Sequence, residues 1–187
     1  MGSDVPNQRG LLLHYSLPEA SCTAEGTVGS IFTITGSGFG YRRGKVLIGG
    51  QPVKIATTGW TPFSITGLIK RPISSGISYN VEIGIKEPKG ATPIVLPGAF
   101  TMMAPEIGTV TPDTGTEGEA IEIVGNFFST MKPKVYLGQK KCTVRSWGMN
   151  KIAFEVPKKM DPGLYAVTIS NRVGSDTLVD GFTIIIP

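Results

Sequence analysis

The sequence is poor in histidine, cysteine and long apolar runs, and each shortage excludes a class of function. Its 187 residues contain one histidine, His14, which lies near the N-terminus. A His-based general base, a Ser-His-Asp triad and a His-rich metal site are therefore excluded from the folded domains. No stretch is long and apolar enough to span a bilayer, so no membrane insertion is expected within this chain.

Charged residues are also scarce, at 17% of the chain. Two carboxylates can perform acid–base catalysis without histidine, but the first half offers no suggestive pair among Glu19, Glu25, Glu82 and Glu87. In the second half, acids gather around one turn: Asp113, Glu117, Glu119 and Glu122. We interpret these as solvated turn residues, with a calcium site as the alternative. The prediction is a protein with no enzymatic activity, cofactor or metal.

The two cysteines, Cys22 and Cys142, lie in different halves of the chain. Two cysteines cannot form a disulfide framework, so we expect two separate, half-buried thiols that behave as small apolar side chains. They leave the redox compartment undetermined, because secreted proteins do not require disulfides.

Turn-forming residues are abundant, with 25 glycines and 14 prolines. Short runs of Val, Ile and Thr alternate with clusters of Gly, Pro, Asn and Asp, which is typical of many short strands joined by turns. No segment shows a helical apolar period over several turns. The composition therefore predicts an all-β fold.

The chain repeats itself. "GTVGSIFTITGSGFG" (26–40) matches "GTEGEAIEIVGNFFS" (115–129) at an offset of 115 − 26 = 89, and "KVLIGG" matches "KVYLGQ" at the same offset. Trp60 and Ile65 then correspond to Trp147 and Ile152. These matches indicate two copies of one domain.

Each copy is predicted to contain about seven short strands. In "AIEIVG", "KVYLG" and "YAVTI" every second residue is apolar and is expected to face a core. We place the domains at 18–104 and 105–187, after an N-terminal linker (1–17) that begins with "MGS", typical of a cloning remnant. The connection "TMMAP" (101–105) is short and apolar, which predicts domains that meet end to end in a semi-rigid rod.

The second copy resembles a known family. "GNFF", "KVYLG", Trp147, "IAFEVP", "GLYAVTISN" and a closing "FTI" occur in that order and are similar to the IPT/TIG domain. The first copy resembles it less closely in its loops. The resemblance implies an immunoglobulin-like β-sandwich, a fold found in cell-surface receptors, in tandem arrays on bacterial surfaces, beside carbohydrate-active enzymes and in some transcription factors. The fold alone does not choose among these.

One glycine-rich segment, "GSGFGYRRGK" (36–45), resembles a phosphate-binding loop. A phosphate cradle needs glycine amides that converge on a helix N-terminus, but the next segment reads as a strand. In the second copy Gly38, Gly40 and Gly44 become Phe127, Ser129 and Pro133. We therefore interpret the glycines as turn residues.

Binding surfaces are suggested by basic and aromatic residues. The formal charge is +4, and the middle of each copy is basic, which indicates either a surface for an anionic polymer or lysines that keep strand edges soluble. Trp60 and Trp147 could stack on sugar rings, but their equivalent positions in the two copies favour framework packing. Aromatic residues present in one copy only, Tyr41 and Phe127, are better ligand candidates. Together with neighbouring basic residues, the predicted ligand-contacting residues are Tyr41, Arg42, Arg43, Phe127, Lys132 and Lys134.

These observations predict a non-catalytic, secreted or cell-surface tandem module that acts as a spacer or an adhesion unit for a protein or polysaccharide ligand. A nucleic-acid-binding or dimerisation fragment of transcription-factor type is one alternative, and the accessory domains of a carbohydrate-active enzyme are another. Both copies close on a similar motif, "FTMMAP" and "FTIIIP". We therefore expect a fragment of a longer tandem protein, without its signal segment.

Overall fold

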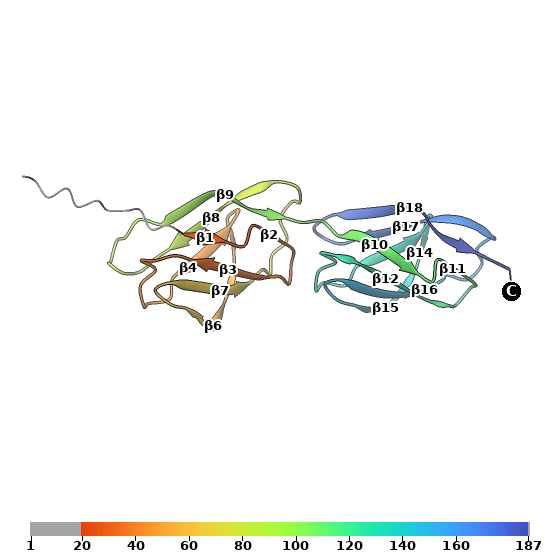
Figure 1. The fold of residues 1–187 in the computed structure, drawn as a ribbon, viewed down its shortest axis with the longest axis horizontal. Coiled ribbons are helices and arrows are strands. Elements are labelled where there is room, and N and C mark those ends of the chain that lie inside the picture. Colours follow the sequence, from red (N-terminus) through yellow and green to blue (C-terminus); the bar gives the residue numbers. More distant parts are fainter. Residues whose placement is uncertain (1–19, 187) are drawn as a thin grey trace, which may run out of the picture.

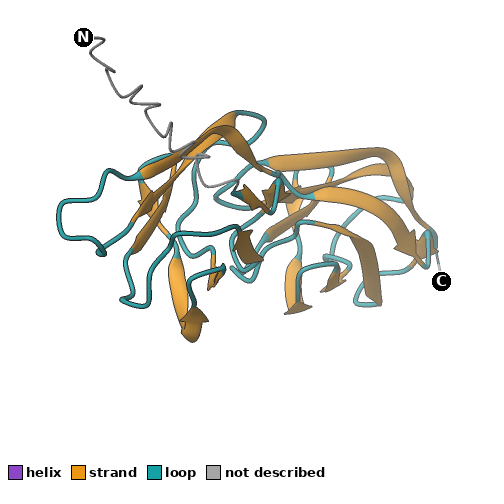
Figure 2. Ribbon diagram, turned by 60° about the vertical axis from the view of Figure 1, so that its left-hand side comes forward, coloured by secondary structure: helices purple, strands orange, loops and turns teal. Residues whose placement is uncertain are grey.

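The computed structural model describes residues 20–186, which form two β-sandwiches placed end to end (Figure 1). We call residues 20–104 domain 1 and residues 105–186 domain 2. Figure 2 shows strands and loops throughout the described chain, and no helix in it is long and apolar enough to cross a membrane. The all-β prediction is confirmed.

Domain 1 contains nine strands in two sheets. They are β1 (Ser21–Cys22), β2 (Glu25–Gly26), β3 (Ile31–Thr35), β4 (Lys45–Ile48), β5 (Gln51–Pro52), β6 (Lys54–Trp60), β7 (Ser64–Leu68), β8 (Ser78–Gly84) and β9 (Ile94–Met102). One sheet has the order β1-β3-β7-β6 and the other β2-β9-β8-β4-β5. All pairings are antiparallel except that of β2 with β9.

Domain 2 repeats this arrangement strand for strand. Its strands are β10 (Glu106–Thr111), β11 (Thr114–Gly115), β12 (Ala120–Asn126), β13 (Lys134–Leu137), β14 (Lys140–Lys141), β15 (Thr143–Trp147), β16 (Lys151–Glu155), β17 (Gly163–Ser170) and β18 (Ser175–Ile184). The sheet orders are β10-β12-β16-β15 and β11-β18-β17-β13-β14. The strand order thus confirms the internal repeat.

The expected seven strands per copy become nine because two short pieces are added. The first strand is split in each domain, so that β1 joins one sheet and β2 the other. A two-residue strand, β5 or β14, then forms a tight hairpin with the strand before it. Such short pieces carry too few residues for an alternating pattern to show in the sequence.

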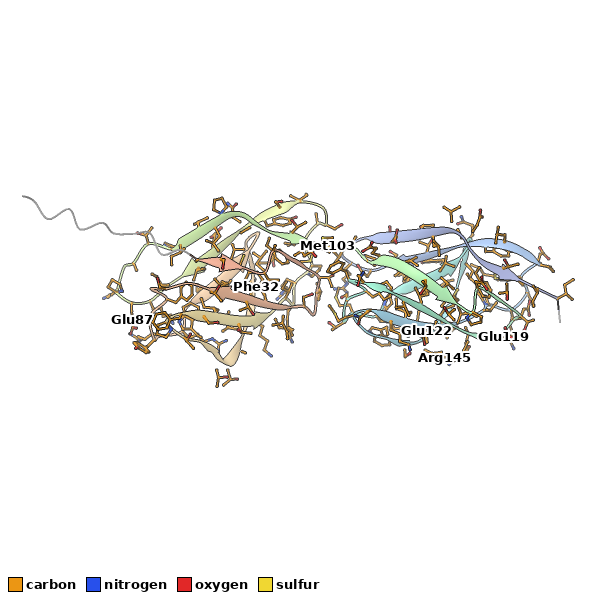
Figure 3. The ribbon with its side chains drawn as sticks, in the orientation of Figure 1. Phe32, Glu87, Met103, Glu119, Glu122 and Arg145 are labelled. Atoms are coloured by element: carbon orange, nitrogen blue, oxygen red, sulfur yellow. The ribbon has the colours of Figure 1, made fainter. Side chains whose placement is uncertain are left out.

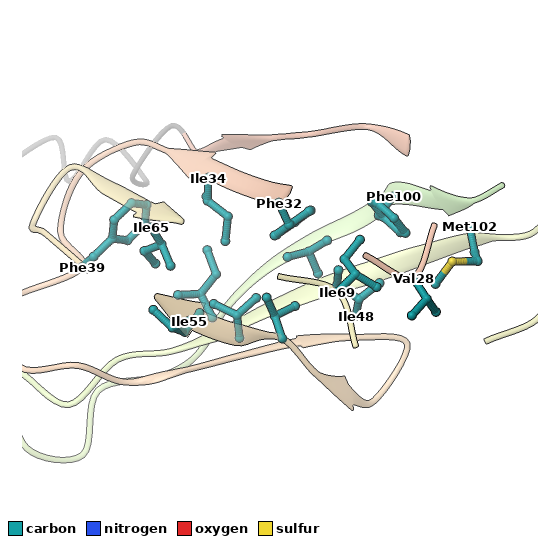
Figure 4. Packing of buried hydrophobic residues seen from close by; sticks show 14 of the residues in the cluster. Val28, Phe32, Ile34, Phe39, Ile48, Ile55, Ile65, Ile69, Phe100 and Met102 are labelled. Atoms are coloured by element: carbon teal, nitrogen blue, oxygen red, sulfur yellow. The ribbon is translucent and has the colours of Figure 1, made fainter. Parts of the chain in front are cut away.

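Each sandwich has its own core. The predicted alternation is confirmed: Ile121 and Ile123 on β12, and Val135 and Leu137 on β13, are all buried. Figure 4 shows the corresponding core of domain 1, where the Phe32 and Phe100 rings, contributed by opposite sheets, meet edge to face with centroids 5.6 Å apart. Burial of each such side chain stabilises the fold by about 1.5–3 kcal/mol before conformational entropy is counted.

Equivalent side chains hold the same places in both frameworks. The Tyr79 hydroxyl donates to the Ser74 carbonyl at 3.1 Å, and the Tyr165 hydroxyl donates to the Asp161 carbonyl at 2.9 Å. These tyrosines are therefore framework residues.

The two thiols are free, as expected. Cys142 lies in the core of domain 2, where burial raises the pKa of its thiol to about 12. Cys22 is half-buried, and burial raises its pKa as well. Both therefore behave as small apolar side chains.

The two domains share a packed junction. The Thr130 amide of domain 2 donates to the Val28 carbonyl of domain 1 at 3.1 Å. Val173 of domain 2 is 6% exposed and belongs to the buried cluster of domain 1, against which Met131 also packs. Figure 3 labels Met103, which lies on the short connection at this junction. The expectation that the domains meet end to end is confirmed.

Candidate functional site

The six predicted ligand-contacting residues fall in two separate places. Tyr41, Arg42 and Arg43 lie on the β3–β4 loop beside Glu87, at the end of domain 1 away from the junction (Figure 3). Phe127, Lys132 and Lys134 lie on or just after the equivalent β12–β13 loop, which reaches the junction. The structure therefore offers two candidate sites rather than one.

The two loops share an unusual backbone. Gly38 and Gly40 have φ values of 79° and 70°, and the equivalent Phe127 and Ser129 have φ values of 56° and 76°. A strand, β4, follows the glycines, so the turn interpretation is confirmed. Domain 2 keeps the same left-handed conformation without glycine, and the Ser129 hydroxyl accepts a hydrogen bond from the Met131 amide at 3.1 Å.

The loop of domain 1 already surrounds a carboxylate. The amides of Tyr41 and Arg42 donate to Glu87 Oε2 at 3.1 and 3.3 Å. The Arg42 guanidinium lies 4.0 Å from the same carboxylate, and Arg43 donates to the Ile55 carbonyl at 2.8 Å. These donors are engaged within the protein, which leaves Tyr41, 85% exposed, as the free group of this loop.

The domain 2 loop borders a basic surface. Lys132 and Lys134 line two grooves, of about 500 Å³ and 640 Å³, on either side of the start of β13. Lys141 lines the first groove and Arg172 the second. Within residues 20–186, no ion pair engages any of these four side chains. We treat the two adjacent grooves as one surface and call it the basic groove; its cations are Lys132, Lys134, Lys141 and Arg172.

The corresponding surface of domain 1 has mixed charge. Lys45 and Lys86, the equivalents of Lys134 and Arg172, line a smaller groove of about 310 Å³ together with Glu82. A carboxylate there weakens the attraction for an anion. The uncompensated basic groove is therefore a feature of domain 2.

Trp147 lies beside the basic groove and is 40% exposed. Lys132 Nζ stands 5.5 Å from the centroid of its ring, and its indole N–H donates to the Thr130 carbonyl at 3.1 Å. Trp60 instead packs against Phe39, with ring centroids 6.5 Å apart, and borders the core of domain 1.

Framework packing is thus confirmed for Trp60, whereas the ring of Trp147 is partly exposed and lies against Lys132. In both domains the indole N–H is held by a loop carbonyl, of Gly40 or Thr130. This shared anchor agrees with the equivalent positions of the two tryptophans in the sequence. The two rings nevertheless have different neighbours, a buried phenyl group for Trp60 and a lysine side chain for Trp147.

Three other basic residues of domain 2 have partners. Arg145 forms a two-point ion pair with Glu155, with both N–O distances at 2.6 Å, and Lys151 lies 2.7 Å from Glu122. The hydrogen bond from Arg145 lowers the pKa of Glu155, and the same bond raises the pKa of Arg145. Lys140 donates to the Lys158 carbonyl at 2.7 Å.

The clustered acids of domain 2 serve local contacts. Glu119 accepts from the Thr116 amide at 2.9 Å, and Glu117 accepts from the Met160 amide at 3.0 Å. Within residues 20–186, no three His, Cys, Asp or Glu side chains gather in a way that could hold a metal ion. His14 and Glu19 lie outside the described residues.

The fold and these sites define a pair of immunoglobulin-like β-sandwiches. Residues 105–184 match the family model of the IPT/TIG domain, so domain 2 is an IPT/TIG domain, and domain 1 repeats its strand order. A search of curated protein sequences finds no significant match.

Several solved structures are similar to this chain. The plexin A4 extracellular region shares 16% identity over 98% of this chain and 20% of its own, with a TM-score of 0.47. The surface glycan-binding protein of Prevotella bryantii shares 16% identity over 82% of this chain and 36% of its own, with a TM-score of 0.41. A protein from a xyloglucan utilization locus of Bacteroides uniformis shares 19% identity over 88% of this chain and 49% of its own, with a TM-score of 0.40. The chain spans less than half the length of each.

Proposed function

We propose that this protein is a non-catalytic spacer of the extracellular or cell-surface side, which holds neighbouring domains or ligand sites at a fixed separation. The extracellular setting is the one that the family resemblance implies. The observation that carries the spacer function is the packed junction between the domains. A flexible connection would let the two sandwiches reorient, whereas a shared core fixes their relative orientation.

The junction is built from preorganised loops. Asn171 Oδ1 accepts from the amides of Val173 and Gly174 at 2.7 and 3.1 Å, and Asn171 Nδ2 donates to the Phe128 carbonyl at 3.2 Å. One side chain thus ties the β17–β18 turn to the β12–β13 loop. The turn places Val173 in the core of domain 1 and brings Gly174 against Ala104.

A distance distribution between spin labels tests the spacer. Labels are attached to cysteines introduced at the exposed positions Thr57 in domain 1 and Gln139 in domain 2, with Cys22 and Cys142 replaced by alanine. A rigid spacer gives one narrow distribution, and Val173→Asp broadens it because a charge cannot remain in the shared core. A distribution that is already broad before the Val173 substitution contradicts the proposal.

A second candidate function is the binding of an anionic polysaccharide to domain 2. The observation that favours it is the basic groove beside the exposed ring of Trp147. Cations can engage sulfate or carboxylate groups, and an aromatic face suits a sugar ring. Tyr41 stays a separate candidate contact at the far end of domain 1.

Titration with heparin, with uncharged dextran and with duplex DNA, at low and near-physiological salt, tests this binding. Lys132→Ala, Lys134→Ala and Trp147→Ala should each weaken heparin binding, while Lys54→Ala, an exposed lysine of domain 1, is the matched control. Equal losses of heparin affinity in all four variants would mean that heparin is attracted by the overall positive charge and not by the basic groove. Sequence-dependent DNA binding that persists at higher salt would instead favour the nucleic-acid alternative.

A further inference from the structure

The two domains end in equivalent ways, but one end is covered and the other is open. The Met103 amide donates to the Gly26 carbonyl at 2.8 Å as the chain leaves domain 1. The Ile185 amide donates to the Gly115 carbonyl at 3.0 Å as the chain leaves domain 2. The exit of the last strand is therefore the same in both sandwiches.

A matched pair of glycines shows the difference. At Gly29 of domain 1 an added Cβ would collide with the Thr130 side chain of domain 2. At the equivalent Gly118 of domain 2 an added Cβ would meet nothing within 4 Å. Both glycines have positive φ, 101° and 81°, so the two turns share one conformation. They differ in that the Thr130 side chain packs against Gly29, whereas Gly118 has open space beside it.

The uncovered end of domain 2 is apolar. Ile185 is 48% exposed and Ile186 is 74% exposed, whereas their equivalents in domain 1, Met103 and Ala104, are both half-buried. A groove of about 430 Å³ runs beside the isoleucines, and its lining also includes Met160. We call Glu117, Met160 and Ile184–Ile186 the end face.

The end face carries a carboxylate at a position that is apolar on the covered surface. Glu117 stands where domain 1 has Val28, and its carboxylate accepts from the Met160 amide at 3.0 Å. The loop tip that covers domain 1 carries Lys132 next to Met131, and Arg172 next to Val173. A tip of this kind combines apolar side chains for the isoleucines with cations that complement Glu117.

We propose that the end face is a docking surface for the loop tip of another IPT/TIG-type sandwich, seated on domain 2 as domain 2 is seated on domain 1. This inference rests on the spacer function and extends it, because the same packed junction would recur along the rod. Each domain would then hold a fixed orientation relative to the next.

A chain with a third sandwich tests the end face. Residues 106–187 are repeated directly after Pro187, so that the new junction has the spacing of "MMAP" before Glu106. Spin labels are placed at Gln139 in domain 2 and at the equivalent glutamine of the added sandwich. The matched variant is Ile186→Asp, and a second chain carries labels at Thr57 and Gln139 to report on the original junction.

We expect one narrow distance distribution across the new junction, and a broad one in Ile186→Asp. A broad distribution across the new junction before any substitution overturns the docking surface. A narrow distribution that Ile186→Asp leaves unchanged overturns it too. The Thr57–Gln139 pair reports separately on the spacer, so failure of one proposal is distinguishable from failure of the other.

Sedimentation of the two-domain chain identifies a competing occupant. If the end face accepts a second copy of this chain, the protein assembles head to tail as its concentration rises, and Ile186→Asp abolishes the assembly. That result would overturn the proposed occupant. A monomer at all concentrations agrees with a surface that is specific for a tethered sandwich.

Discussion

The amide of Thr130 donates to the carbonyl of Val28 at 3.1 Å, so a loop of domain 2 is hydrogen-bonded to a turn of domain 1 across 102 positions of sequence, 130 − 28. Backbone hydrogen bonds between domains demand a defined relative orientation because their geometry is narrow. Around this bond, Val173 and Met131 close the end of the domain 1 core. The link between the domains is therefore part of the folded structure.

Gly125 is expected to tolerate no side chain. An added Cβ would collide with the carbonyl oxygen of Glu106, the neighbouring strand's backbone, and would lie 2.6 Å from Phe128 Cζ. We predict that Gly125→Ala lowers the free energy of unfolding of domain 2 by about 2–3 kcal/mol, measured by urea denaturation. Gly148→Ala is the matched control, since its Cβ would meet nothing closer than 3.9 Å. Equal effects at the two sites would contradict the close strand contact.

Phe127 is expected to reverse the usual ranking of alanine and glycine. Its φ of 56° lies in the left-handed region, which glycine adopts without strain and other residues adopt at a cost of about 1 kcal/mol. We predict that Phe127→Gly is more stable than Phe127→Ala by about 1 kcal/mol in thermal or urea unfolding. At Phe63, exposed and outside the positive-φ set, alanine should be the more stable of the two.

The thiol of Cys142 is expected to be unreactive in the folded protein. Burial raises its pKa to about 12, so at pH 8 the reactive thiolate is about 10⁻⁴ of the total. In Cys22→Ala protein, Ellman's reagent should label Cys142 no faster than the protein unfolds. In Cys142→Ala protein, the half-buried Cys22 should react faster. Rapid labelling of Cys142 in the native state would contradict its burial.

The pair of Arg145 and Glu155 is expected to add stability above acid pH. Arg145 lowers the folded-state pKa of Glu155 below its ordinary value of 4.5. A carboxyl group whose pKa is lowered by folding stabilises the fold above its unfolded pKa, and the contribution disappears as the pH falls through the folded pKa. Glu155→Gln should therefore be slightly less stable than the unsubstituted protein at pH 7, and the difference should disappear as the pH falls through the folded-state pKa of Glu155.

Salt provides the control for this ion pair, because both partners are exposed and their attraction is screened. The small difference at pH 7 should shrink in concentrated sodium chloride. A difference that grows toward acid pH would contradict the assigned role of Glu155.

The sequence predicts much of the fold because the internal repeat supplies two independent patterns for one structure. Strand alternation in "AIEIVG" and "KVYLG" correctly places Ile121, Ile123, Val135 and Leu137 in the core. The two-residue strands were missed, because two residues carry no alternation.

The candidate sites are less predictable because they depend on contacts between distant segments. Nothing local shows that Glu87 captures the amides of the Tyr41 loop, or that Trp147 faces Lys132 rather than a core. Val173 and Gly174 were also missed, although they form the junction. Their signal is the pattern of Asn171 followed by Gly174, typical of a tight turn, but the sequence does not show what that turn contacts.

The central claim is that the two sandwiches move as one body, and ¹⁵N relaxation of the intact chain tests it most directly. We predict a single rotational diffusion tensor, elongated along the rod, that fits the amides of both domains. In Val173→Asp the two domains should instead require separate tensors, while Val179→Asp, at a position 73% exposed on β18, should leave the single tensor unchanged. Separate tensors in the natural sequence would contradict the account.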